Sequence, residues 1–286
     1  MTTVAKASAA EPAAPTALRE VVVSDRQTLW EAAREMADYR ELLIFLARRD
    51  VTIRYRQTAF GAAWAVLQPL ITMLIFTTLF TRVVSVQTYG LPAPVFYYSA
   101  LLPWIYFSGA LRSSSISLVV NAQIIRKVYF PRLILPASAA LVGLVDLAVG
   151  FVVMLLLLGY YGMLSWHLVL WVPLTVLVAL FVFGAGCLLA AINVKYRDVG
   201  HALPFLIQIW LFVTPIIYSS NSVPARYRLL VWLNPMAGYI EAFRAASRAA
   251  PLPWTALGIA AGVTLVSLVV GIAYFRRAEG QFTDIV

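Results

Sequence analysis

Acidic residues are scarce in this sequence of 286 residues, and their scarcity excludes several kinds of site. Asp146, Asp198 and Glu241 are the only carboxylates between Val51 and Phe275. Because they lie far apart in the sequence, paired carboxylates for acid–base chemistry and an acidic cluster for a divalent cation are not expected. This shortage disfavours an integral membrane enzyme such as a glycosyltransferase.

Cysteine and histidine are almost missing, which bears on metal binding. Cys187 is the single cysteine and lies in an apolar run, so we expect neither a disulfide framework nor a thiolate metal site. His167 and His201 are the only histidines, one near each end of an apolar run. We therefore expect no metal site on this chain.

Lysine is equally rare, and its positions exclude a nucleotide-binding loop. None of the three lysines follows a glycine or precedes Ser or Thr, so the GxxxxGK[ST] loop that cradles phosphates is absent. If the protein uses ATP, another polypeptide must bind it. We therefore expect no cofactor on this chain itself, and any ATP and Mg²⁺ would be held by a partner subunit.

Apolar residues, by contrast, make up 62% of the sequence, charged residues only 12%, and the mean hydropathy is +0.83. A soluble domain of this length cannot bury so much apolar surface, whereas a bilayer about 30 Å thick can. Gly258 and Gly262 form one small-xxx-small pair, which alone is weak evidence for close helix packing. The sequence predicts an all-α polytopic membrane protein with six spans, at about 61–84, 95–120, 133–158, 168–192, 202–218 and 254–275.

The N-terminal part divides into a tail and an amphipathic helix. Residues 1–28 are rich in Ala and Pro and read as a disordered cytoplasmic tail, whereas 29–286 form one membrane domain. Residues 30–50 place apolar side chains on one helical face but carry too many charges to span. They predict a helix in the headgroup plane; a soluble helix packed on a partner is the alternative.

The basic residues fix an orientation. With the N-terminus in the cytoplasm, sixteen of the 22 fall in cytoplasmic segments, nine of them up to Arg56. Because cytoplasmic loops are enriched in Arg and Lys, we predict that both termini are cytoplasmic. The net charge of +9 then needs no nucleic-acid partner. The other seven basic residues of the predicted cytoplasmic segments are Arg126, Lys127, Arg132, Lys195, Arg197, Arg276 and Arg277.

Besides Arg82 at the rim of the first span, two charged residues fall inside predicted spans. Asp146 is either a functional group, such as a proton relay, or a carboxyl that packs against another helix, and we favour packing. Arg112 either faces a polar conduit or snorkels toward a headgroup. Ser108 and Ser115 lie four and three residues away, so they share a polar helical face with it.

Aromatic residues gather near the span ends, Tyr97 and Trp104 among them. An interfacial belt is the simpler explanation. Stacking on the apolar faces of sugar rings is the functional one. The conduit candidates are Tyr97, Trp104, Ser108, Arg112 and Ser115.

Three stretches resemble one family. They are RRDVTIRYRQTAFGAAWAVLQPL entering the first span, LPWIYFSGALRSSSISLVVNAQIIRKVYFPRLILP between the second and third, and VWLNPMAGYIEAFR before the last. Together they resemble type-2 ABC exporter permeases, in particular those for lipid-linked polysaccharides such as O-antigen and teichoic acid. The resemblance covers about residues 35–280.

The resemblance implies two functional segments. A coupling helix at about Asn121–Phe130, ended by Pro131, would dock on the nucleotide-binding subunit. Short re-entrant helices within Val223–Pro253 would form an exterior gate. The coupling candidates are Asn121, Gln123, Arg126, Lys127, Tyr129 and Phe130, and the gate candidates are Trp232, Asn234, Pro235, Glu241 and Arg244.

The resemblance also implies partners and a substrate. Such permeases form homodimers with two copies of a cytoplasmic ABC ATPase, in the bacterial inner membrane, and export a glycan on an undecaprenyl-type pyrophosphate. Arg48, Arg49, Arg54 and Arg56 are the pyrophosphate candidates, or else they anchor the helix to anionic lipid. A same-fold permease for a drug or small lipid, and a proton-coupled transporter that uses Asp146 and Arg112, stay open as alternatives.

Overall fold

The computed structural model describes residues 29–56, 63–81, 88–280 and 282. These residues form helices and contain no strand, so the expected all-α class is confirmed. The predicted disordered tail at 1–28 lies outside the described residues.

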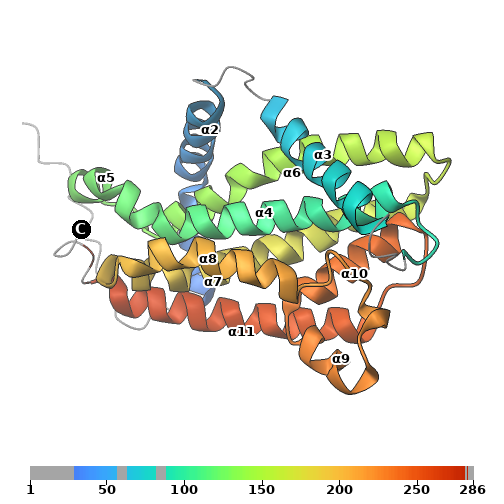
Figure 1. Cartoon of the computed structure of the whole chain (residues 1–286). Coiled ribbons are helices and arrows are strands. Elements are labelled where there is room, and N and C mark those ends of the chain that lie inside the picture. The colour runs from blue at the N-terminus through green and yellow to red at the C-terminus, as the bar shows by residue number, and fades with distance from the viewer. Residues whose placement is uncertain (1–28, 57–62, 82–87, 281, 283–286) are drawn as a thin grey trace, which may run out of the picture.

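Four long helices form the bundle: α4 (Ala93–Val120), α6 (Ile134–Tyr160), α7 (Trp171–Lys195) and α11 (Trp254–Glu279). They run lengthwise beside one another in Figure 1, with α4 packed on both α6 and α7, and α7 packed on α11. The segment α5 (Ala122–Lys127) marks one end of the bundle. At the other end lie α9 (Ala225–Trp232) and α10 (Pro235–Ser247).

Three helical stretches are long and apolar enough to cross a membrane: Ile134–Tyr160, Trp166–Lys195 and Trp254–Glu279. The second includes the 3₁₀ turn η3 (Trp166–Leu170). Shorter apolar helices are α3 (Trp64–Leu79) and α8 (Asp198–Val213). Helices thus occur at all six predicted spans, whereas the count of six crossings and the orientation stay predictions.

The predicted single helix at 30–50 is in fact two helices, α1 (Leu29–Asp38) and α2 (Arg40–Arg56). They are almost continuous, because the Tyr39 amide donates to the Glu35 carbonyl (3.2 Å) and Leu43 to Tyr39 (3.1 Å). In Figure 1, α2 runs across the direction of the bundle. It also reaches Arg56, so all four candidate arginines of this region belong to one helix.

The predicted C-terminal ends of two helices are wrong. The helix predicted at 202–218 ends at Val213, since Thr214 precedes Pro215 and adopts an extended conformation (φ −84°, ψ 137°). The coupling helix ends at Lys127, since Val128 is already extended, so Pro131 does not terminate it. The predicted first span, 61–84, is described only in part.

Helices α7 and α11 approach each other closely at two glycines. A Cβ atom built on Gly271 would overlap the carbonyl group of Gly184, and one on Gly184 would lie 2.7 Å from the Leu268 backbone nitrogen. By contrast, a Cβ on Gly258 or Gly262 would meet no described atom within 4 Å. The sequence motif therefore does not mark this approach.

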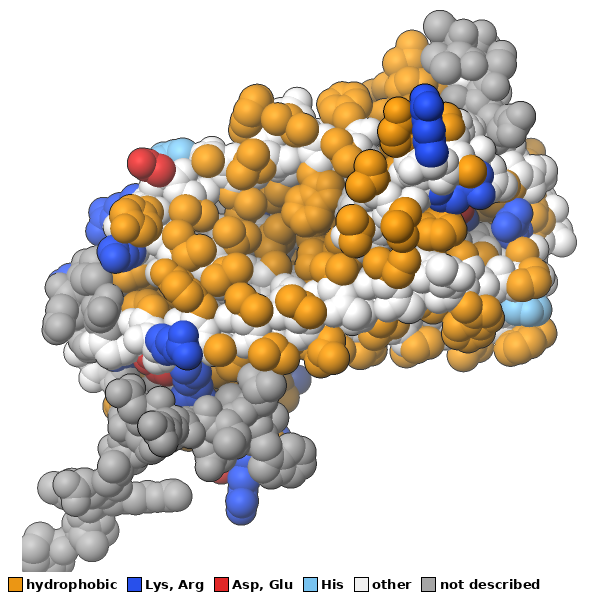
Figure 2. Space-filling view, turned by 90° about the horizontal axis from the view of Figure 1, so that it is seen from below, with side chains coloured by type: hydrophobic (Ala, Val, Ile, Leu, Met, Phe, Trp, Pro, Cys, Tyr) orange, Lys and Arg blue, Asp and Glu red, His pale blue; other side chains and the backbone are white. Residues whose placement is uncertain are grey.

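The outer surface is apolar over its middle. In Figure 2, hydrophobic side chains cover the central part of one long face, while Arg and Lys lie toward its two ends. Large exposed apolar side chains include Leu74 on α3, Phe205 and Phe212 on α8, and Leu265 on α11. This distribution suits a hydrocarbon environment around the bundle.

The Gly184–Gly271 approach yields a stability prediction. Gly271→Ala should destabilise the protein by about 2 kcal/mol, because the added methyl group forces the helices apart. Thermal unfolding in detergent measures this as a lower midpoint. The matched control Gly262→Ala should leave the midpoint unchanged or raise it, since alanine favours helix. Equal midpoints for the two variants would contradict the close approach.

Candidate functional site

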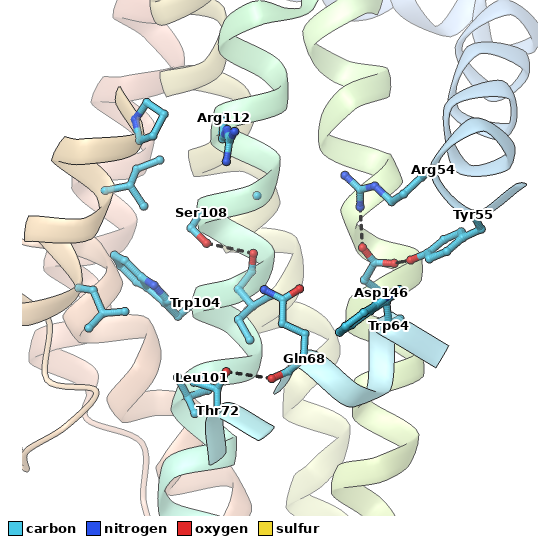
Figure 3. Close-up of a pocket in the computed structure, with 16 residues that line it drawn as sticks. Arg54, Tyr55, Trp64, Gln68, Thr72, Leu101, Trp104, Ser108, Arg112 and Asp146 are labelled. Atoms are coloured by element: carbon cyan, nitrogen blue, oxygen red, sulfur yellow. Dashed lines mark hydrogen bonds and ion pairs between the residues drawn. The ribbon is translucent and has the colours of Figure 1, made fainter. Parts of the chain in front are cut away.

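A polar pocket of about 570 Å³ opens in the side of the bundle (Figure 3). Helix α4 forms its floor, α3 and α8 contribute to its walls, and α2 and α6 contribute Arg54, Tyr55 and Asp146. A pocket lined by charged and hydroxyl groups is unexpected in an apolar bundle, because each such group must be solvated or bonded there. It is therefore the leading candidate for a ligand site.

Two helical stripes line this pocket. Trp104, Ser108 and Arg112 follow one another at four-residue spacing on α4, which places them on one face. All three are conduit candidates from the sequence, and the structure brings them together. The facing stripe on α3 has the same spacing, but sequence reasoning missed it although the spacing was visible; it consists of Trp64, Gln68 and Thr72.

The charged groups of the pocket gather toward one end. In Figure 3, Arg54 and Arg112 lie toward one end, Trp64 and Trp104 lie nearer the middle, and Thr72 lies toward the other end. Since α4 runs from the α10 end to the α5 end, Arg112 lies on the α5 side of Trp104. The cations therefore lie toward the α5 end of the pocket.

Asp146 of α6 forms an ion pair with Arg54 of α2, with 2.6 Å between Arg54 Nη1 and Asp146 Oδ2. The Tyr55 hydroxyl donates to the other carboxylate oxygen. Burial, reinforced by that hydrogen bond and the negative charge of Asp146, raises the pKa of Tyr55 to about 12, so it remains a donor at neutral pH. Asp146 thus packs against another helix, as favoured from the sequence, and its partner is Arg54 rather than Arg112.

Two conduit candidates, Tyr97 and Ser115, and three of the four α2 arginines do not line this pocket. Tyr97 is fully buried and packs edge-on against Phe96 and Phe76. Ser115 is buried and donates to the Arg112 carbonyl (2.8 Å). Among the arginines of α2, Arg48 and Arg56 are exposed and do not line this pocket, and Arg49 binds Asp50 and Asn121, each at 2.8 Å.

The candidate coupling residues divide into an outer and an inner set. Gln123, Arg126, Lys127 and Tyr129 are exposed at the end of the bundle. Phe130 is buried, in a second apolar cluster that also contains Leu46 of α2 and Phe275 of α11. Asn121 accepts the hydrogen bond from Arg49 and so ties this segment to α2.

The gate candidates of α10 include a buried ion pair. Arg244 is fully buried and lies 3.1 Å from Glu241 Oε1. It also donates to the carbonyls of Pro215 (2.6 Å) and Ile216 (2.7 Å), which follow α8, and lies 3.7 Å from the ring centre of Phe96. Glu241 in turn accepts from the Ser220 hydroxyl (2.9 Å).

The start of α10 is fixed by its cap. The Asn234 side chain accepts from the Met236 amide (3.1 Å) and the Trp210 indole (3.0 Å), and donates to Thr214. Pro235 occupies the first helical turn, where its missing N–H costs nothing. Trp232, at the end of α9, is half-buried. These contacts hold α10 against the loop after α8.

Comparisons with known proteins decide the family. The model of the ABC-2 type transporter family matches residues 41–247. The chain belongs to this family. It is 32% identical to the O-antigen export system permease protein RfbA of Myxococcus xanthus over 256 residues, which cover 88% of this chain and 97% of that protein. This result confirms the resemblance found in the three sequence stretches.

Other relatives agree. A permease of the same name from Klebsiella pneumoniae is 28% identical over 86% of this chain and 95% of its own length. The polysialic acid transport protein KpsM of Escherichia coli is 26% identical over 82% of this chain and 93% of its own. With its three long apolar helices, the chain is a multi-pass permease of the bacterial inner membrane.

The buried ion pair of α10 yields a prediction. Arg244→Met removes a cation that binds several carbonyls and leaves Glu241 buried without it, so it should destabilise the protein by about 3–5 kcal/mol. Thermal unfolding and limited proteolysis at 214–222 measure the effect. Arg226→Met, at an exposed position on α9, serves as the control and should be neutral. A wild-type unfolding midpoint and proteolysis pattern for Arg244→Met would contradict a stabilising role for these Arg244 contacts.

Proposed function

We propose that this chain is the membrane subunit of an ATP-driven exporter that moves a polysaccharide, linked to a polyprenyl pyrophosphate, from the cytoplasm across the inner membrane. One observation carries the proposal: a polar pocket with two arginines at one end and indole, amide and hydroxyl groups beyond them, inside an apolar bundle. The relatives named for O-antigen export and polysialic acid transport support the same substrate class.

The lining matches the two parts of such a substrate. Guanidinium groups bind phosphate oxygens in a planar, two-pronged manner, so Arg54 and Arg112 suit the pyrophosphate. Trp64 and Trp104 suit the apolar faces of sugar rings, and Gln68 suits their hydroxyls. A drug or small lipid would not need so many polar groups.

A second copy of the chain would complete the conduit. Helices α3 and α8 flank the pocket and carry exposed apolar side chains, including Ile71 and Leu74 on α3 and Phe205 and Ile209 on α8. A symmetric partner packed against these two helices would cover that surface and enclose the pocket. We therefore propose a homodimer with the passage between the two subunits.

The end of the bundle that carries α5 would face the cytoplasm and two ATPase subunits. It carries Arg126, Lys127 and Arg132, and Arg276 near the end of α11, as expected for a cytoplasmic surface. The exposed outer set of α5 offers a small docking surface. The ATP and Mg²⁺ would be bound by those partner subunits.

A proton-coupled carrier is less well supported. Among the described residues, the pocket lining contains one carboxylate, Asp146, and no histidine, so no chain of titratable groups continues from Asp146 there. Transport that survives ATP depletion but stops when the proton gradient collapses would favour this alternative over the proposal.

Deletion of the gene tests the proposed function directly. Cells that lack the protein should accumulate the lipid-linked glycan on the cytoplasmic side and lose it from the surface, and a plasmid copy should restore export. The purified protein should also co-purify with an ABC ATPase. Failure to associate with any ATPase would refute the exporter.

The docking assignment yields a separate prediction. Replacing Arg126 and Lys127 by Glu reverses the charge of exposed positions, so the complex with the ATPase should weaken and export should fall by tenfold or more, while the membrane level of the chain stays normal. Quantitative blotting and co-purification measure both. The control Arg277→Glu changes an exposed residue of α11 and should have a smaller effect. Normal export by the double variant would contradict docking through α5.

A further inference from the structure

We infer that Asp146 is the resident counter-ion of an anion site centred on Arg54, and that a phosphate group of the ligand takes its place there. This inference rests on the proposed function, since it takes the ligand to be a phosphate-bearing lipid. It adds a role for Asp146, which sets how tightly that phosphate is bound.

The geometry of the ion pair supports exchange. Arg54 and Asp146 retain 37% and 25% of their side-chain exposure, so a ligand in the pocket can reach both. Within the described residues, the pair engages Arg54 through Nη1. A guanidinium group carries five N–H donors, so a phosphate can approach Arg54 before the carboxylate leaves.

The charges of the pocket also favour an anion. In the part of the chain that the structure describes, its lining contains two arginines, Arg54 and Arg112, against one carboxylate, Asp146. Asp146 neutralises Arg54 while the pocket is empty, which avoids an unpaired charge in an apolar bundle. A pyrophosphate carries more negative charge than a carboxylate and can contact both arginines, so it competes well for Arg54.

The position of Asp146 explains why displacement matters. It is in α6, about 18 Å along the helix from Ile134. The ion pair therefore fastens α2 to the middle of α6. The same helix α2 binds Asn121 through Arg49 (2.8 Å), beside α5. When a phosphate releases Asp146, one of the contacts that hold α2 is lost, and α2 links the pocket to the docking segment.

Ligand binding to variants of the full-length protein in nanodiscs tests the inference. The probes are undecaprenyl diphosphate and, separately, inorganic pyrophosphate. Asp146→Asn removes the competing charge and should bind undecaprenyl diphosphate about tenfold more tightly, whereas Arg54→Gln should bind it at least tenfold more weakly. The double variant should resemble Arg54→Gln, because the gain from asparagine acts through Arg54.

Two further variants provide controls. Asp146→Glu keeps the carboxylate and should bind nearly as the wild type does, and Arg40→Gln changes an exposed arginine at the start of α2 and should have no effect. Tighter binding of both probes to Asp146→Asn indicates that phosphate alone is recognised. Tighter binding of the lipid alone indicates that the carrier is required. Both results support the counter-ion.

The inference is overturned if folded Asp146→Asn binds undecaprenyl diphosphate with wild-type or lower affinity. It is also overturned if the asparagine gain persists in the double variant. Export measured in cells keeps this result separate from the proposed function. If Asp146→Asn leaves affinity unchanged while the wild-type protein exports glycan, the counter-ion role fails and the exporter stands.

Discussion

A charge inside this apolar bundle needs a partner, and the chain obtains most of these partners from distant parts of the sequence, although Glu241 lies only three residues from Arg244. Arg54 pairs with Asp146, Arg276 with Glu35 at 2.6 Å, and Arg244 binds Glu241 and the loop after α8. Because an unpaired buried charge costs several kcal/mol, the contacts of the fully buried Arg244 fix α10, whereas the partly exposed pairs of Arg54 and Arg276 hold α2 and α1 more weakly. The outer helices are thereby held to a bundle that otherwise packs through apolar contacts.

These pairs give the two ends of the molecule different properties. At the α10 end, Arg244 of the fully buried helix α10 donates to the backbone carbonyls of Pro215 and Ile216 in the loop after α8, so that region is fixed. The pair of Arg54 with Asp146, at the middle of α6, and the pair of Arg276 with Glu35, near the α5 end, are both partly exposed. Partly exposed pairs contribute less stability and exchange more easily. The buried contacts of Arg244 are thus the stronger ones, and the contacts of Arg54 and Arg276 are the weaker ones.

Local sequence features predicted some parts of the pocket better than others. The polar face of α4 was visible because Trp104, Ser108 and Arg112 repeat with the helical period. The α3 stripe has the same spacing, but its members are uncharged and did not stand out. The close approach of Gly184 to Gly271 was not predictable, because two glycines 87 residues apart carry no local signal. By contrast, a Cβ added at Gly258 or Gly262 of the visible motif would meet no described atom within 4 Å.

The sequence by itself determined the class of the protein: a helical membrane permease with no nucleotide loop, whose apolar runs and family motifs are properties of local composition. It also located the long helices to within a few residues. Two helix ends were missed: α8 ends before Thr214, which precedes a proline, and the short α5 ends before Val128, where no proline follows directly. Only the tertiary structure decided that Arg54 pairs with Asp146 and that the buried Arg244 binds the Pro215 carbonyl after α8. Such pairings depend on how helices cross in space, and no spacing along the chain encodes that.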